Sequence, residues 1–283
     1  MVYRGADIDF ETENRLRRHV AESARLPAAL TVEAAVAAVM CVLVERLTAG
    51  EAHELLEGMP EPLRPMFQRC VLHRGGQPLL TLDRAELLAR VADHLDVTPA
   101  HAEVVTSAVF DAVRSELPRE LVANVAAQLP HGLKELWLSR PILAPDLDAS
   151  VPAEEQRRLV EADIERWARL PAGVTAAAAF KAVMCSLSRR LSGGEAKDVL
   201  LGLPRELREL VDGCVIHRGE RAAVFGRDEL RRDVAEHLAV GDADAESITL
   251  AVLRAAKRVL PQQTIVAVAS QLPRDLADVW TSA

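Results

Sequence analysis

The chain has 283 residues, and its hydrophobic share of 49% is typical of a globular protein and excludes a largely disordered chain. Its 34 basic and 42 acidic side chains give a formal net charge of -8, and only 3% of its residues are aromatic. Nucleic acid is therefore a poor partner, because a phosphate backbone attracts basic surfaces and single strands stack on aromatic rings.

The sequence also indicates the cellular compartment of the protein. Residues 1–14 carry four acidic side chains and lack the basic-then-apolar pattern of a secretory signal. The most apolar run, Ala34–Val44, is shorter than the roughly 20 residues that a membrane-spanning helix needs. Four cysteines in a chain of this length do not indicate a disulfide scaffold, so we expect free thiols in a reducing compartment. These observations predict a cytoplasmic protein without membrane contact.

The first quarter of the chain predicts four helices in succession. Leu16, Val20 and Ala24 lie on one face of a short helix. A longer helix over residues 36–47 follows, because apolar side chains recur there at i, i+3, i+4, i+7, i+8 and i+11. Thr48-x-x-Glu51 is a capping box that begins a third helix, and Pro60 begins a short fourth one.

The same succession recurs in the later quarters. The short helices are predicted around residues 87–95, 160–168 and 230–238, and longer ones over 105–113 and 180–191. The start signals of the third helices are Pro118, Ser192-x-x-Glu195 and Pro261, with each proline expected at the first helical position. The final helices begin at Pro130, Pro204 and Pro273. Residues 79–82 and 222–225 are at most brief extended connectors, so the sequence predicts an all-α fold.

The two halves of the chain repeat each other. Cys70–Gly75 recurs 144 positions later as Cys214–Gly219, and after one deleted residue Trp137 recurs as Trp280. A fainter period of about 70 residues lies within each half. We therefore predict two tandem helical-bundle domains over residues 1–139 and 153–283, each built from two related repeats. A proline-containing linker is expected over residues 140–152.

The turn motifs of both halves resemble a known family. They comprise Thr48–Ala52 with Met59–Arg64, and Ser192–Ala196 with Leu203–Arg208. A long amphipathic helix followed by such a capped turn and a Leu-Pro-x-x-Leu-Arg segment is similar to the bacterial domain-of-unknown-function family numbered 2267. The resemblance covers nearly the whole chain as two copies. It implies a fold and brings no established reaction, ligand or catalytic residue.

The repeated cysteines and histidines are the first candidates for chemistry. Two thiols and two imidazoles in each half match the ligand set of a tetrahedral zinc site. The set in the first half is Cys41, Cys70, His73 and His94, and in the second half Cys185, Cys214, His217 and His237. Cys70 and His73 could also join Cys214 and His217 in one site. The other interpretation is that the cysteines are core thiols and the histidines cap helices.

The repeated His-Arg-Gly segments allow two interpretations as well. Arg74 and Arg218, each followed by glycine, could form an anion pocket with exposed amides. Histidine, arginine and glycine are also the ordinary signals for the end of a helix, and this interpretation is the favoured one. Trp137 and Trp280 are expected to cover the edge of the core.

No catalytic motif accompanies these candidates. The chain has no G-x-S-x-G, no phosphate-binding glycine loop and no dinucleotide fingerprint. The sequence therefore favours a non-enzymatic module for protein interaction or self-association over an enzyme. No cofactor is expected for such a module. The alternative is a small-molecule or metal-binding sensor that uses the repeated Cys/His positions, for which zinc is the candidate metal.

Overall fold

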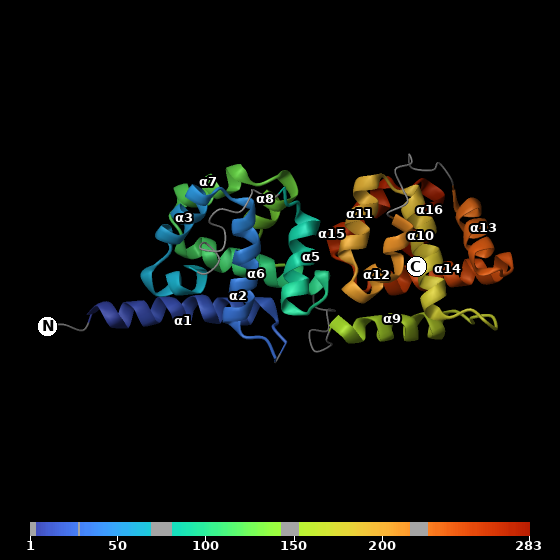
Figure 1. Cartoon of the computed structure of the whole chain (residues 1–283), viewed down its shortest axis with the longest axis horizontal. Coiled ribbons are helices and arrows are strands. Elements are labelled where there is room, and N and C mark those ends of the chain that lie inside the picture. Colours follow the sequence, from blue (N-terminus) through green and yellow to red (C-terminus); the bar gives the residue numbers. More distant parts are fainter. Residues whose placement is uncertain (1–3, 28, 69–80, 143–152, 216–225) are drawn as a thin grey trace. The chain divides into compact units, whose positions relative to one another are not determined.

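The computed structural model describes residues 4–27, 29–68, 81–142, 153–215 and 226–283. Within these ranges the chain forms sixteen helical elements and no β-strand (Figure 1). The predicted all-α fold is therefore confirmed. The predicted connectors at residues 79–82 and 222–225 and the linker over 140–152 lie largely outside the described residues.

The helices follow each other in the same order in two copies. The first copy contains α1 (Arg4–Ala24), α2 (Val32–Arg46), α3 (Ala49–Gly58), the 3-10 turn η1 (Glu61–Leu63), α5 (Arg84–Leu95), α6 (Pro99–Glu116), α7 (Arg119–Gln128) and α8 (His131–Leu138). The second copy contains α9 (Ala153–Trp167), α10 (Ala176–Arg190), α11 (Gly193–Gly202), α12 (Arg205–Val215), α13 (Arg227–Leu238), α14 (Asp242–Lys257), α15 (Gln262–Gln271) and α16 (Arg274–Ser282). Chain contacts divide the protein into two compact units, which correspond closely to the two copies.

Helix α10 lies at the centre of the second copy, where α9, α11, α12, α13 and α14 all pack against it (Figure 1). Its buried positions go almost all round the helix, as expected for a helix surrounded by others. Many of them carry small side chains, such as Ala179, Ala182 and Ser186, which allow neighbouring helices to approach closely. Phe180 and Met184 fill the wider spaces and are fully buried. The core of this copy therefore forms around one apolar helix.

The predicted helix starts are largely confirmed. Thr48 Oγ1 accepts from the amide of Glu51 at 3.3 Å, and Glu51 Oε2 accepts from the amide of Thr48 at 2.8 Å, which completes the capping box. Ser192 Oγ accepts from the Glu195 amide at 3.4 Å. Pro118 and Pro261 stand at the N-cap and not at the first helical position, so that prediction is wrong by one residue.

The Leu-Pro-x-x-Leu-Arg segment closes the end of the preceding helix. Arg64 Nε donates to the Met59 carbonyl at 3.0 Å, and its Nη2 donates to the Glu57 carbonyl at 2.9 Å. These carbonyls have no intrahelical partner at the end of α3, and a cation there is also favoured by the helix dipole. The motif is thus a structural one.

The two repeated tryptophans lie within the core and not only at its edge, where the sequence predicts them. Trp137 and Trp280 are at most 1% exposed. Each indole Nε1 donates to a backbone carbonyl at 3.1 Å, that of Val122 in the first copy and that of Ile265 in the second. The buried N–H groups are therefore satisfied in the same way twice.

One ion pair is reversed between the copies. In the first copy Arg90 on α5 donates to Glu45 on α2 at 2.6 Å. At the equivalent places of the second copy Arg189 on α10 donates to Asp233 on α13 at 2.9 Å. The signs are exchanged while the two helices keep the same contact, so the copies dock this helix pair alike.

The N-termini of α5 and α13 are capped by different residues. Asp83 precedes α5, and its Oδ1 accepts from the Glu86 amide at 2.8 Å. The equivalent residue before α13 is Gly226, which has no side chain. Here Asp275 of α16 supplies the carboxylate, and its Oδ2 accepts from the Arg227 amide at 2.7 Å. A Cβ added at Gly226 would lie 2.4 Å from this oxygen, so the glycine leaves room for the replacement cap.

Because Asp275 supplies the cap that Gly226 lacks, the effect of Gly226→Asp on stability depends on whether Asp275 is present. We expect Asp275→Ala to lower the free energy of unfolding by about 1 kcal/mol, as loss of an N-cap does. Gly226→Asp should recover about that amount (~1 kcal/mol) in the Asp275→Ala background, because it restores the arrangement of the first copy. In the wild type the same change should give no gain, because two carboxylates would compete for one place.

Urea unfolding of the four proteins measures this coupling, with Asp278→Ala on the same helix as the control for loss of an exposed carboxylate. Equal effects of Gly226→Asp in both backgrounds would contradict the replacement cap.

Candidate functional site

The structure describes only part of the repeated Cys/His set. Cys41 lies on α2, His94 in the last turn of α5, Cys185 on α10 and His237 in the last turn of α13. The remaining candidates lie outside the described residues or, for Cys214 on α12, have an undescribed side chain. These are Cys70, His73, Arg74, Cys214, His217 and Arg218.

The described histidines bond to backbone near helix ends. His94 Nδ1 lies 2.8 Å from the Arg90 carbonyl, and His237 Nδ1 lies 2.8 Å from the Asp233 carbonyl. Both bonds reach back four residues along the histidine's own helix, to a carbonyl that precedes the last turn, so neither histidine caps an unpaired carbonyl at the helix end.

The cysteines differ between the copies. Cys185 is buried and forms no disulfide, whereas Cys41 is disulfide-bonded. The expectation of four free thiols is therefore wrong for Cys41, and a sulfur in a disulfide is not the thiolate that zinc binds. No group of three or more His, Cys, Asp or Glu that could hold a metal ion occurs among the described residues. The zinc site and the anion pocket at Arg74 and Arg218 stay predictions.

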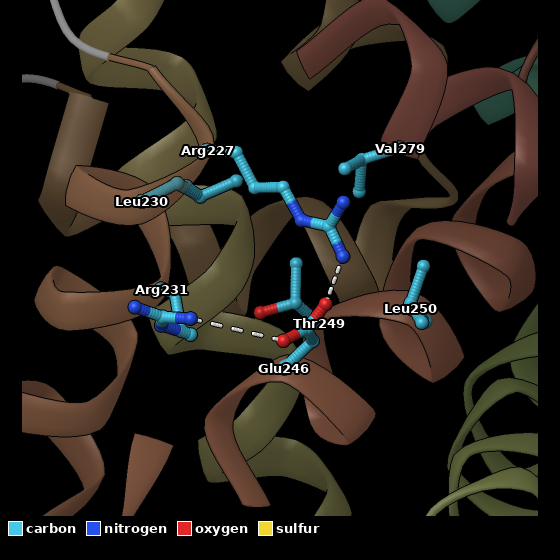
Figure 2. Close-up of a pocket in the computed structure, with 7 residues that line it drawn as sticks. All are labelled: Arg227, Leu230, Arg231, Glu246, Thr249, Leu250 and Val279. Carbon is cyan, nitrogen blue, oxygen red and sulfur yellow. Dashed lines mark hydrogen bonds and ion pairs between the residues drawn. The ribbon is translucent and has the colours of Figure 1, made fainter. Parts of the chain in front are cut away.

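A different site lies in the second copy, between α13, α14 and α16 (Figure 2). It is a shallow depression that is open to solvent and encloses only about 10 Å³. We call it the slot and define it by its lining residues, which are Arg227, Leu230, Arg231, Glu246, Thr249, Leu250 and Val279. This enclosed space is far below the roughly 300–1,000 Å³ of small-molecule pockets, so an occupant would lie against the slot and not inside it.

Apolar side chains form much of the slot. Leu230, one turn into α13, is 2% exposed, and Val279 of α16 is 6% exposed. Thr249 is buried too, and its Oγ1 donates to the Ala245 carbonyl at 2.7 Å, so the hydroxyl is already satisfied. Leu250 is half-buried. The slot therefore offers apolar surface and no activated nucleophile.

Two arginines and one glutamate stand at the slot. Arg227 donates to Glu246, and Arg231 Nη1 lies 3.9 Å from the other oxygen of the same carboxylate (Figure 2). The bond to Glu246 raises the pKa of Arg227. Arg231 also lies 3.3 Å from Asp228 and 3.4 Å from Asp242. The charges are thus balanced within the second copy, and the arginines leave no strong anion site.

The first copy keeps part of this arrangement. Arg84 Nη2 donates to Glu103 Oε1 at 2.6 Å, which repeats the pair of Arg227 and Glu246. Leu88 and Ser107 take the places of Arg231 and Leu250.

In the first copy a segment of the chain itself lies at the place of Leu250. The amide of Ile142 donates to Ser107 Oγ at 2.9 Å, and Ser107 Oγ donates to the Val104 carbonyl at 2.9 Å. Residues 140–142 follow α8 and have no helical structure. The first copy therefore shows a non-helical segment that is bonded at this position through the backbone amide of Ile142.

The repeat alignment contains the only sequence signal for the slot. It shows that Leu88 and Ser107 change to Arg231 and Leu250, both on faces of predicted helices. It does not show that α16 brings Val279 beside them, because this depends on tertiary packing. Sequence analysis therefore missed the slot.

Comparison with known proteins places the chain in a family. The model of the family described as "Uncharacterized conserved protein (DUF2267)" matches residues 13–136 and 160–279. The chain belongs to the DUF2267 family. The two matches confirm the predicted tandem copies of this family. No curated protein and no solved structure matches the chain.

The DUF2267 match agrees with the helical fold and assigns no chemistry to the slot or to the Cys/His set. In the part of the chain that the structure describes, no helix combines the length and apolar character needed to cross a membrane.

The cap beside the slot makes stability depend on pH. The amide of Arg227 lowers the pKa of Asp275 below its ordinary 3.8, and nearby Arg190 adds to this. A lowered pKa in the folded state stabilises the protein above the unfolded pKa of about 4, and this stability is lost as the pH falls through the folded pKa. Because Asp275 is exposed, we expect on the order of 0.5 kcal/mol.

Urea unfolding of Asp275→Asn between pH 6 and pH 2.5 tests this, since asparagine keeps the acceptor and removes the titration. The variant should lose less stability on acidification than the wild type, and Asp278→Asn should behave as the wild type. Identical pH profiles for Asp275→Asn and the wild type would contradict the assignment.

Proposed function

We propose that this DUF2267 protein is a non-enzymatic protein-interaction module. In this proposal the slot of the second copy binds an extended segment of a partner protein through an aliphatic side chain. The observation that carries the proposal is the difference between the copies at one position. Ser107 Oγ accepts from the backbone amide of Ile142 in the first copy, whereas the equivalent Leu250 of the second copy is half-buried and lines the slot.

The chemistry of the slot supports a side chain as its occupant. Leu230, Leu250 and Val279 give an apolar lining, and an aliphatic side chain that covers it gains a part of the roughly 1.5–3 kcal/mol that full burial contributes. Arg227 and Glu246 already pair with each other, so a neutral occupant leaves no charge without a partner. An extended segment also brings free backbone groups to which such charged side chains can bond.

Polar side chains that occur in both copies bond within the fold, which supports a structural role for them. The indole groups of Trp137 and Trp280 bond to backbone, and Arg84 and Arg227 each pair with a glutamate of the following helix. These pairings hold helices together, and none of them adjoins an activated nucleophile. Interaction through the surface therefore accounts for the described side chains better than catalysis does.

The test uses a peptide with the chain's own sequence from Ser139 to Ala144, labelled with fluorescein and added to the full-length protein. We expect saturable binding by fluorescence anisotropy. Leu250→Arg should weaken it by about tenfold or more, because the variant removes apolar surface and adds a third cation at the slot. Val266→Arg is the matched control, since Val266 is 58% exposed on α15 and does not line the slot.

A peptide with aspartate in place of the isoleucine should not bind. Absence of saturable binding to the wild type, or equal binding to the wild type and Leu250→Arg, would overturn the proposal. Circular dichroism of both variants checks that they fold.

A further inference from the structure

Helix α9 of the second copy carries a partly exposed stripe that the first copy lacks. Leu159, Asp163 and Trp167 follow each other at i, i+4 and i+8 and therefore share one face of the helix. Leu159 is 46% exposed and Trp167 is half-buried. The equivalent residues of α1 in the first copy are Arg15, His19 and Ser23, so the apolar character belongs to the second copy alone.

Two arginines of α14 lie against this stripe. The guanidinium carbon of Arg254 stands 4.3 Å from the centre of the Trp167 ring, and that of Arg258 stands 6.0 Å from it. Both lie within the range of a cation–π contact. Arg258 Nη1 also donates to Asp163 at 2.5 Å, so this arginine has a carboxylate partner.

Arg254 is held in place and has no carboxylate partner. Stacking on the ring occupies the face of the guanidinium, whereas its N–H groups lie in the plane and stay available. Among the residues that the structure describes, none accepts a hydrogen bond from or forms an ion pair with Arg254.

The surroundings of Arg254 are positively charged. Lys257 lies three residues further on and donates to the carbonyls of Trp280 and Ala283, both at 2.6 Å. Burial lowers the pKa of Lys257, and the charge of Arg254 lowers it further. Asp163 is the one carboxylate paired with this group of three cations among the described residues, and Arg258 occupies it.

The position of Arg254 carries a different charge in the first copy. Asp111 stands at the place of Arg254, accepts from Arg114 at 2.7 Å and lies 3.0 Å from His19. The charge at this position is therefore reversed and already paired within the first copy.

Arg254 is also a direct neighbour of the slot. Leu250 and Arg254 are four residues apart on α14, so they lie on the same face about 6 Å apart along the helix axis. An extended chain advances about 3.3 Å per residue, so about two residues of a bound segment span this distance.

We propose that the partner segment carries an acidic residue two positions from its aliphatic anchor, and that this carboxylate binds the free edge of Arg254. This inference rests on the proposed function, in which the slot binds the aliphatic anchor. An arginine fork and a carboxylate fit each other through two parallel hydrogen bonds, and the stacked Trp167 holds the fork in position. The partner is an acidic protein segment and not a nucleic acid, because one carboxylate needs only one arginine fork, whereas a phosphate backbone needs an extended basic surface, which a chain of net charge -8 does not favour.

The test adds a carboxylate to the peptide of residues Ser139–Ala144. In one version aspartate replaces the last residue, two positions after the isoleucine, and in another it replaces the arginine two positions before it. Both versions are needed because the peptide can run in either direction along α14. We expect one of them to bind the full-length protein about tenfold more tightly than the parent peptide, since a charge-assisted pair contributes about 1.4 kcal/mol or more.

The gain should disappear in Arg254→Gln and remain in Arg232→Gln, which removes an exposed arginine of α13 that does not line the slot. Fluorescence emission from Trp167 should change when the acidic peptide binds. Loss of this change in Trp167→Phe identifies Trp167 as its source, because Trp137 and Trp280 are buried.

The outcomes separate the two proposals. If the parent peptide binds but neither aspartate version binds more tightly, or if the gain persists in Arg254→Gln, the role of Arg254 is wrong and the slot stands. If an acidic peptide without the isoleucine binds equally well, charge alone attracts it, and the proposed spacing is wrong. If no version binds, both proposals are wrong.

Discussion

Burial of one helix on nearly all its sides is the constraint on which each copy depends. In the second copy this helix is α10, whose small side chains let five neighbours pack against it, and α2 carries a similar set of buried residues in the first copy. The polar groups inside this core are small: Ser188 Oγ donates to the Met184 carbonyl at 2.5 Å, and Ser186 Oγ is buried without a hydrogen-bond partner among the described residues. The chemistry available for function therefore lies on the outside of the bundle.

The duplication supplies an internal comparison that separates structure from surface. Equivalent cations close the C-terminal end of each copy, where Arg114 donates to the Ser139 carbonyl and Lys257 to the Trp280 carbonyl. The buried tryptophans are likewise kept. The positions that change most in character are on the surface of α13, α14 and α9, where the second copy acquires a slot and an arginine stacked on Trp167. Binding properties can diverge there because the core does not depend on these residues.

The sequence predicted what is local and missed what depends on packing. Helical periodicity located the helices, and the capping box at Thr48 and Glu51 located a helix start, because both patterns act over a few residues. Asp275 caps a helix that begins 48 residues earlier in the chain, so no local pattern announces it. The slot has the same origin, since α16 completes it. Of the Cys/His candidates, sequence alone did not indicate that Cys41 is disulfide-bonded.

Native-state hydrogen exchange of the full-length protein tests the central claim most directly. If the surrounded helix holds each bundle together, the amides of α10 should exchange only through unfolding of the whole copy and be the slowest in it. Those of α15, where Val268 is the one fully buried residue, should exchange much faster through local opening. Exchange of α10 at the rate of α15 would contradict the account.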